Sequence, residues 1–112
     1  MIIGGTTYPY LYNAQSWNFD KELVGYNGKN EPIYADTSFF ELKTNRLDGA
    51  ELLWWTTTLL TGLPSKEFSS LTIYDRYNAQ TAYTHCIVQK PIWSRFDGFD
   101  YFDVTIRIVD IY

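Results

Sequence analysis

FDYFDVTIRIVDIY (residues 99–112) is the segment of the chain with the clearest secondary-structure pattern. Its apolar and polar residues alternate, and a period of two is the pattern of a strand that buries one face. A strand is therefore predicted over 99–112, with one face toward the core and the other toward solvent. The inward face carries Phe102, Val104, Ile106 and Ile108, and the outward face carries Asp103, Thr105 and Arg107.

An Asp-Gly pair lies directly before this strand, at 97–98. Asp-Gly favours the positive φ angles of a two-residue hairpin turn. Residues 92–96 are therefore predicted to be extended and to pair with the final strand in antiparallel orientation. Ile111 and Tyr112 are themselves β-formers, so both are expected to be paired with another segment.

A second, longer hairpin is predicted upstream. Residues 10–24 lack helical spacing, and Trp17 and Phe19 alternate with polar residues, so a strand with these two on its buried face is expected. Residues 33–45 are apolar and β-branched and form a second extended run. Between them, 25–32 contains Asn-Gly and a proline, which favour a loop. The two runs are predicted to form one hairpin with an eight-residue tip.

The second strand of that hairpin has apolar residues on both faces. Phe40 and Leu42 share one face, whereas Phe39 lies on the other with Glu41 and Lys43. We expect Phe40 and Leu42 to be buried and Phe39 to face outward.

Residues 48–61 have the start and stop signals of a helix. Asp48 is a good N-cap residue with Glu51 three positions later, which is the spacing of a capping box. Gly62 and Pro64 follow where a helix commonly ends. Three consecutive threonines at 56–58 favour the alternative of a strand, but the signals at both ends favour the helix.

The helix is predicted to bury one stripe of side chains. Trp54 falls on the far side of this stripe, where no buried partner is expected. The inner stripe carries Leu52, Trp55, Thr56 and Leu59.

After the helix, residues 70–74 are predicted to be a short strand with Leu71 and Ile73 on one face. Residues 75–81 are polar and are predicted to be a loop, and 82–90 a strand that ends at Pro91. The order is therefore β-β-α-β-β-β in one domain, 1–112, of the α+β class with mainly antiparallel strands.

Charge and composition exclude several classes of protein. The net charge is −4 and the pI about 4.7, which argues against a nucleic-acid binder that depends on phosphate contacts and against a polybasic membrane-surface protein. No run approaches the roughly 20 apolar residues of a membrane-spanning helix. The first residues, MIIGG, lack a signal-peptide pattern, so synthesis in the cytoplasm without export is expected.

Residue types that could support catalysis are few. His85 is the one histidine and Cys86 the one cysteine, and adjacent strand residues point to opposite faces and cannot act as a pair. Asp97 is explained by the turn, and Asp100 and Asp103 fall on opposite faces of the last strand. We therefore predict no catalytic, metal-binding or cofactor-binding residue and no enzyme activity. A hydrolase with a carboxylate pair is the least favoured alternative.

Aromatic residues make up 19% of the chain, which is more than one small core readily hides. Some of them, such as Tyr26, Phe39, Trp54, Phe99 and Tyr112, fall on tips, outer faces or the terminus. Exposed aromatic side chains are typical of protein–protein interfaces, and they can also form stacking platforms for sugars.

The order of elements supplies a resemblance where motifs do not. FFEL (39–42) leads into ELLWW (51–55), followed by the run at 87–93 and a terminal β-segment. In this order and length the chain resembles the small tail-tube-fold proteins of tailed bacteriophages, which include tail tube, terminator and minor (distal) tail proteins. The layout is most similar to the minor tail proteins, although it does not separate the three positions along a tail.

The resemblance implies a sandwich or barrel of the tail-tube type, with one long hairpin and one helix (about 48–61). It also implies a structural protein of the virion tail, made in the host cytoplasm. Hairpins from several copies would pair into a cyclic, six-fold ring, through which DNA passes without specific binding. The partners are then the chain itself and adjacent tail proteins, with no cofactor and no membrane.

Eight residues are the candidate contacts between subunits. They lie at the hairpin tip, on outer faces and at the C-terminus: Gly25, Tyr26, Asn27, Gly28, Lys29, Phe39, Trp54 and Tyr112. The alternative function is a small monomeric β-rich binding module that uses surface Tyr and Trp to hold a glycan or a protein ligand.

Overall fold

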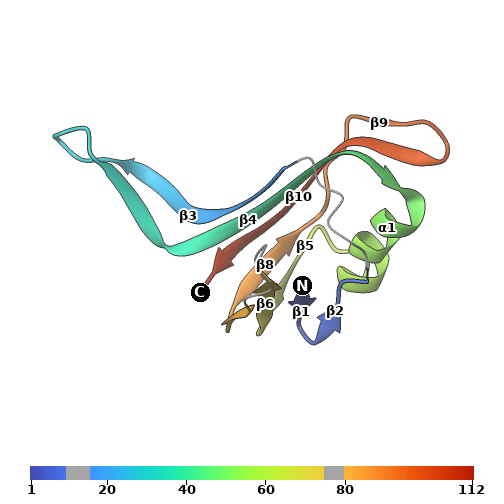
Figure 1. Ribbon diagram of the computed structural model, residues 1–112, viewed down its shortest axis with the longest axis horizontal. Helices are drawn as coiled ribbons and strands as arrows, with labels where there is room; N and C mark the ends of the chain where they lie inside the picture. The colour runs from blue at the N-terminus through green and yellow to red at the C-terminus, as the bar shows by residue number, and fades with distance from the viewer. Residues whose placement is uncertain (10–15, 75–79) are drawn as a thin grey trace.

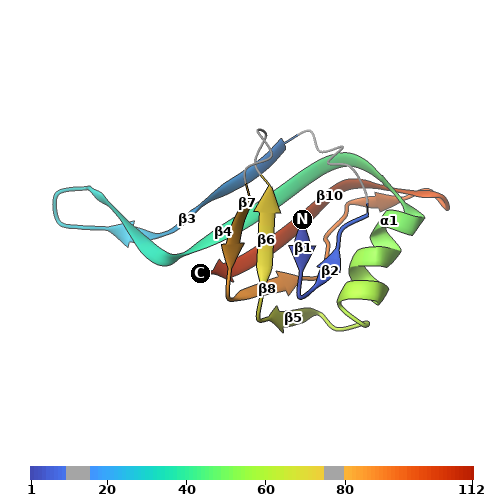
Figure 2. The ribbon, with the colours of Figure 1, turned by 60° about the horizontal axis from the view of Figure 1, so that its bottom comes forward.

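The computed structural model describes residues 1–9, 16–74 and 80–112. They form two antiparallel sheets and one short helical segment, so the fold is α+β and mainly β (Figures 1 and 2). Neither sheet closes into a barrel within this described part of the chain. Figure 2 shows the smaller sheet crossing in front of the larger one.

The larger sheet has six strands, with the order β3-β4-β10-β8-β5 and with β9 paired to β10. Its strands are β3 (Ser16–Tyr26), β4 (Pro32–Asp48), β5 (Ser65–Phe68), β8 (Cys86–Gln89), β9 (Arg95–Phe96) and β10 (Asp100–Ile111). The smaller sheet has the order β2-β1-β6-β7. Its strands are β1 (Ile2–Ile3), β2 (Thr6–Thr7), β6 (Leu71–Tyr74) and β7 (Gln80–Tyr83).

The centre of the larger sheet confirms the alternation read from 99–112. Ile106 of β10 lies opposite Leu42 of β4, and Ile108 lies opposite Phe40. All four side chains are buried. Phe102 departs from the pattern because it is only half-buried, with the Arg95 guanidinium 4.3 Å from its ring centroid.

The alternation of inward and outward side chains shifts by one residue at the end of β10. Ile108 pairs with Phe40 but Ile111 pairs with Ser38, so β10 has one extra residue there. Asp110 adopts a φ of 54°, as in a bulge. The bulge turns Ile111 rather than Asp110 toward the core, and Ile111 is buried.

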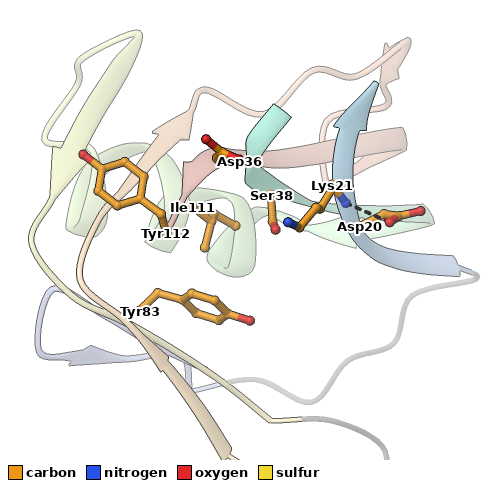
Figure 3. Close-up of a pocket in the computed structure, with 7 residues that line it drawn as sticks. All are labelled: Asp20, Lys21, Asp36, Ser38, Tyr83, Ile111 and Tyr112. Carbon is orange, nitrogen blue, oxygen red and sulfur yellow. Dashed lines mark hydrogen bonds between the residues drawn. The ribbon is translucent and has the colours of Figure 1, made fainter. Parts of the chain in front are cut away.

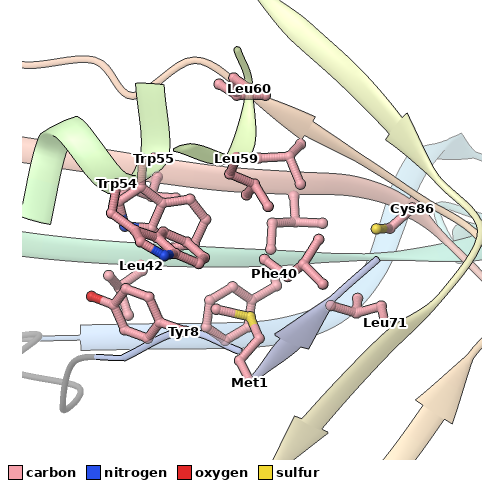
Figure 4. Packing of buried hydrophobic residues seen from close by; sticks show 14 of the residues in the cluster. Met1, Tyr8, Phe40, Leu42, Trp54, Trp55, Leu59, Leu60, Leu71 and Cys86 are labelled. Carbon is pink, nitrogen blue, oxygen red and sulfur yellow. The ribbon is translucent and has the colours of Figure 1, made fainter. Parts of the chain in front are cut away.

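The core lies between the two sheets and the helical segment (Figure 4). Tyr8 and the neighbouring Trp54 and Trp55 pack together at its helical side. The indole Nε1–H of Trp55 has no hydrogen-bond acceptor among the described residues. The buried apolar side chains are Met1, Ile3, Tyr8, Phe40, Leu42, Leu47, Leu52, Trp54, Trp55, Leu59, Leu60, Leu71, Ile73, Cys86, Val88, Val104, Ile106, Ile108 and Ile111.

The predicted helix is present, but its second half is wider than an α-helix. It begins as α1 (Gly49–Leu53), where the Asp48 carboxylate accepts a hydrogen bond from Glu51 N at 2.8 Å. It then continues as a π-helix, η1 (Trp54–Leu59), and Leu60 N donates to the Trp55 carbonyl five residues earlier. The chain leaves the helix through Thr61 and Gly62, both with positive φ.

The π-helix corrects the prediction for Trp54. With i to i+5 hydrogen bonds, Trp54 and Leu59 share a face, and so do Trp55 and Leu60. All four side chains are buried, and Trp54 is only 8% exposed. An ordinary α-helix would have placed Trp54 on the far side, so this expectation was wrong.

The stretch predicted as a single strand over 82–90 is two strands, which belong to different sheets. The chain leaves the smaller sheet after β7, passes through Thr84 and His85, and enters the larger sheet as β8. Gln80 and Thr81, predicted as the end of a loop over 75–81, belong to β7 instead, and 75–79 lie outside the described residues. The edge strand β5 was not predicted, since its Lys66 and Glu67 obscure any apolar pattern.

The two predicted hairpins are present with different turns. The first hairpin joins β3 and β4, and its strands reach Tyr26 and Pro32, so its loop is shorter than the predicted 25–32. Pro32 can pair there because it is the first residue of its strand. The second hairpin joins β9 and β10, and its loop is longer than Asp97-Gly98, because Phe96 pairs with Tyr101. The expected burial of Trp17 and Phe19 concerns side chains outside the described part.

No helix among the described residues is both long and apolar enough to cross a membrane.

Candidate functional site

The β3–β4 hairpin extends beyond the body of the molecule as an arm (Figure 1). The last pair between β4 and β10 is Ser38 with Ile111. From there outward, the pairing recorded for the described residues is between β3 and β4 only. We call residues 22–34 the distal arm. It contributes to a molecular length of 50 Å against widths of 30 and 29 Å.

The arm leaves the sheet at a bend. Lys21 pairs with Ser38, and the next pair is Leu23 with Tyr34. Between these two pairs β4 therefore has two more residues than β3. Such irregular pairing bends and twists a hairpin. Figure 1 shows the change of direction in both strands at this point. The bend therefore sets the direction in which the arm projects.

The distal arm is rich in exposed apolar side chains. Val24 and Tyr26 are 64% and 63% exposed, and Tyr34 is 53% exposed. Leu23 and Ile33 are exposed as well. Burial of a large apolar side chain stabilises a protein by about 1.5–3 kcal/mol. Five such side chains that stay exposed on one hairpin therefore forgo a large stabilisation, which contact with another surface could supply. Apolar surface gathered in this way is typical of an interaction site.

The tip of the arm is an ordered polar turn. The Asn27 side-chain oxygen accepts hydrogen bonds from Lys29 N at 2.8 Å and from Glu31 N at 3.0 Å. Asn30 adopts a φ of 60° and donates its N–H to the Asn27 carbonyl. Asparagine is common in such turns because its side chain hydrogen-bonds the following backbone. The tip therefore holds the two strands of the arm in a defined pairing.

A surface hollow of about 430 Å³ lies where the arm joins the body (Figure 3). Its charged side chains come from the two arm strands: Asp20 and Lys21 from β3 and Asp36 from β4. Figure 3 shows Tyr83 and Tyr112 on the opposite side from Asp20 and Lys21. Ser38 and Ile111 complete the lining. Within the described chain, no group of three or more His, Cys, Asp or Glu residues is arranged to hold a metal ion.

Tyr112 lies against His85. The two rings are stacked with centroids 4.5 Å apart, and the Tyr112 carbonyl accepts hydrogen bonds from Thr84 N and His85 N. His85 Nδ1 lies 2.8 Å from the Asp110 carbonyl, and Nε2 lies 2.8 Å from Glu67 Oε1.

Both ring nitrogens of His85 therefore face acceptors, which favours the doubly protonated ring. The hydrogen bond to the Asp110 backbone raises the pKa of His85, and partial desolvation opposes it. The Glu67 hydrogen bond and the Glu67 and Asp110 charges add to the increase in this pKa.

The end of the molecule opposite the arm has its own apolar surface, which we call the aromatic end (residues 90–101). Tyr101 stands between Trp93 and Phe96, with ring centroids 4.9 and 4.5 Å away. Phe99, at the tip of the β9–β10 loop, is 83% exposed, and Ile92 is 71% exposed. This end lies beside α1 and is farthest from the arm in Figure 1.

A hollow of about 310 Å³ opens at this end and is lined by Lys90, Pro91, Ile92 and Trp93. The Lys90 ammonium lies 5.9 Å from the centre of the Trp93 ring, within the range of a cation–π contact. A hollow with an aromatic wall and a cation at its rim can receive a planar or apolar group.

Most of the eight candidate contact residues lie on the arm. Tyr26 and Lys29 are exposed, and Gly25 belongs to β3 rather than to a loop. Asn27 and Gly28 form the turn.

The other three candidates lie on the body. Phe39 is half-buried, with the Arg107 guanidinium 5.2 Å from its ring centre. Tyr112 is 56% exposed, whereas Trp54 is buried and offers little surface to a partner.

Sequence reasoning missed most of the apolar surface. It did not select Leu23, Val24, Ile33 and Tyr34 on the arm, or Ile92 at the opposite end. The available signal was two adjacent apolar pairs, Leu23-Val24 and Ile33-Tyr34, because adjacent strand residues face opposite ways and cannot all enter one core.

Comparison with known proteins found no family model, no curated protein and no solved structure that matches this chain.

Proposed function

We propose that the chain is a structural subunit of a bacteriophage tail, of the minor or distal tail class. In this role, copies of it form a cyclic, six-fold ring around the DNA conduit and join the tail tube to neighbouring tail proteins. The proposal starts from the resemblance in the order of elements: a long hairpin, an aromatic helix and a terminal β-run. The observation that carries it is the distal arm.

A two-stranded ribbon on its own is marginally stable in water. The arm, moreover, exposes apolar side chains such as Val24 and Tyr34. Contact with another chain would stabilise the arm and would also cover its apolar side chains. Identical subunits meet such a need most simply in a closed ring, which also covers open sheet edges.

The charge of the chain agrees with a conduit for DNA. With a net charge of −4, the chain repels the phosphate backbone on average. Tight binding would require clustered Lys and Arg that displace counterions from DNA. An acidic ring would therefore let DNA pass without holding it.

The test is the mass of the protein in solution as a function of its concentration. Size-exclusion chromatography with light scattering should give a discrete oligomer at high concentration, and electron microscopy should show rings. A protein that stays monomeric at every concentration accessible to light scattering, and forms no ring on grids, contradicts the proposal.

A second candidate function is a monomeric binding module for glycans. The observation that favours it is the hollow lined by residues 90–93, which lies beside the packed rings of Trp93, Tyr101 and Phe96. Sugars bind by stacking on exposed aromatic rings of this kind. Binding to an oligosaccharide array by a stable monomer, lost in Trp93→Ala, would support this function instead of the ring.

A further inference from the structure

We propose that the distal arm of one copy docks on the aromatic end of a second copy. The inference rests on the proposed self-assembly and identifies the two surfaces that meet in it. The contact joins opposite ends of the molecule. Each copy would therefore insert its arm into one neighbour and receive the arm of another neighbour at its aromatic end.

The positions of the two surfaces make this a head-to-tail contact. The arm and the β9–β10 loop lie at opposite ends of the long axis of the molecule (Figure 1), which measures 50 Å. A contact between different surfaces of identical chains is heterologous, and it produces a closed ring when the rotation between copies closes. A contact between two arms would instead give a two-fold dimer and leave both aromatic ends uncovered.

The two surfaces are complementary in their apolar groups. The arm presents Val24 and Tyr26 as projecting side chains. The aromatic end presents a hollow of about 310 Å³ beside the exposed Ile92. Aromatic side chains such as tyrosine bury about 150–250 Å² when they enter a pocket of this kind. Insertion of one arm would cover apolar surface on both chains.

Charged groups on the two surfaces are complementary as well. The distal arm (22–34) carries two glutamates, Glu22 and Glu31, and one lysine, Lys29, a net charge of −1. Glu31 forms no ion pair among the described residues. At the aromatic end, the exposed Lys90 and Arg95 likewise form no ion pair within the described chain.

The aromatic end also has two acidic groups, Asp97 and Asp100, but both are already engaged. Asp100 forms an ion pair with Arg46. Asp97 belongs to the turn. Backbone hydrogen bonds from Asp100 and Phe99 lower its pKa most, and Arg46 and Arg95 lower it further. Asp97 is thus tied into its own turn, whereas the ammonium of Lys90 is directed over a ring at the hollow. The arm of a second copy brings the Glu31 carboxylate to these cations.

A second copy is the occupant that uses both surfaces. Every chain carries one arm and one aromatic end, so a ring with this contact leaves neither surface uncovered. Contact with an unrelated partner would cover one of them and leave the other exposed to water.

The docking predicts which engineered cysteines become neighbours. The natural Cys86 does not compete, because it is fully buried and burial raises the pKa of its thiol to about 12. Ile92 lines the hollow and is 71% exposed, so it marks the receiving surface. The single variants Tyr26→Cys and Ile92→Cys are mixed in equal amounts and oxidised at a concentration at which light scattering shows the oligomer. Disulfide-linked dimers are then identified by mass spectrometry under non-reducing conditions.

The expected product is the mixed disulfide between residues 26 and 92, in excess over a statistical mixture of the three dimers. Thr6→Cys, on the exposed strand β2, is the control partner, and its mixture with Tyr26→Cys should stay statistical. A statistical mixture for 26 and 92 in a sample that is oligomeric overturns the docking but leaves the ring intact. A protein that stays monomeric throughout overturns both.

A charge exchange provides an independent test that needs no cysteine. Glu31→Lys should weaken self-association roughly two- to fivefold, as expected for an exposed ion pair. Glu31→Lys mixed with Arg95→Glu should recover association, whereas each variant alone should not. If the two variants weaken self-association equally and their mixture does not recover it, the arm does not pair with the aromatic end through these residues.

Discussion

The ring of Tyr8 packs against the indole of Trp54, with centroids 5.1 Å apart and an angle of 66° between the ring planes. Trp55 stands nearly perpendicular to Trp54, with its centroid 4.9 Å away. Two consecutive residues of one helix can both enter the core because the helix is a π-helix from Trp54 onward. Tyr8, which follows β2, is thereby packed against the helical segment.

Replacement of Trp54 should therefore destabilise the fold. Trp54→Ala removes a large buried side chain and its contacts with Tyr8 and Trp55, so the free energy of unfolding should fall by about 3–5 kcal/mol. Urea denaturation followed by circular dichroism measures this change. Leu53→Ala is the matched control, because Leu53 is 60% exposed and its loss should cost within about 0.5 kcal/mol. Equal effects of the two variants would contradict the packing of Trp54.

Loss of the helix cap should have a smaller effect. The Asp48 carboxylate caps Glu51 N, so Asp48→Ala should lower the free energy of unfolding by about 1 kcal/mol. Asp48→Asn keeps the capping oxygen and should retain most of the stability. Desolvation raises the pKa of Glu51 and the Asp48 charge raises it further, so Asp48→Asn should also lower that pKa, as measured by NMR titration. An unchanged pKa would place Asp48 too far away to act.

Stability should depend on pH through His85. Its folded pKa lies above the ordinary 6.5, so the folded state binds more protons than the unfolded state between the two values. The stabilisation is complete below about pH 6.5 and is lost as the pH rises through the folded pKa.

Since His85 is the one histidine, its NMR titration is free of overlap. Glu67→Gln should lower its pKa only in part, because the hydrogen bond to the Asp110 carbonyl is the largest cause and remains. His85→Gln should remove the change of stability over this pH range. If this variant retains the full pH dependence, another group is responsible.

Shortening the arm should separate assembly from folding. Deletion of residues 26–30 leaves Glu31 and Pro32 as the loop between Gly25 and Ile33, which already pair in the hairpin. The core side chains of β4 lie far along the strand from this cut, so the thermal transition should change little. Light scattering should then show loss of the oligomer. An unfolded product would mean that the arm supports the fold of its own chain.

The features that were predicted correctly depend on residues close in sequence. The alternation from Val104 to Ile108, the Asp48 cap and the places of the two hairpin loops, around Asn27 and around Asp97, are local, because each rests on a backbone period or on a side chain that bonds its own neighbours. The burial of Phe40 and Leu42 follows from the same period. These features were enough to assign two hairpins, one helix and a mainly antiparallel α+β fold.

Long-range packing decided the rest. The strand predicted over 82–90 is interrupted at Thr84 and His85, because its first half pairs in the smaller sheet and its second half in the larger one. The π-helix allows Trp54 and Trp55 to be buried in the same core. The bulge at Asp110 and the bend before Leu23 depend on the partner strand, which no local pattern specifies. Sequence alone therefore located the three longest strands, β3, β4 and β10, and many of the residues that are buried. The tertiary structure decided which aromatic residues remain at the surface. Trp54 enters the core through the π-helix, whereas Tyr26 and Tyr34 stay exposed where β3 and β4 pair only with each other.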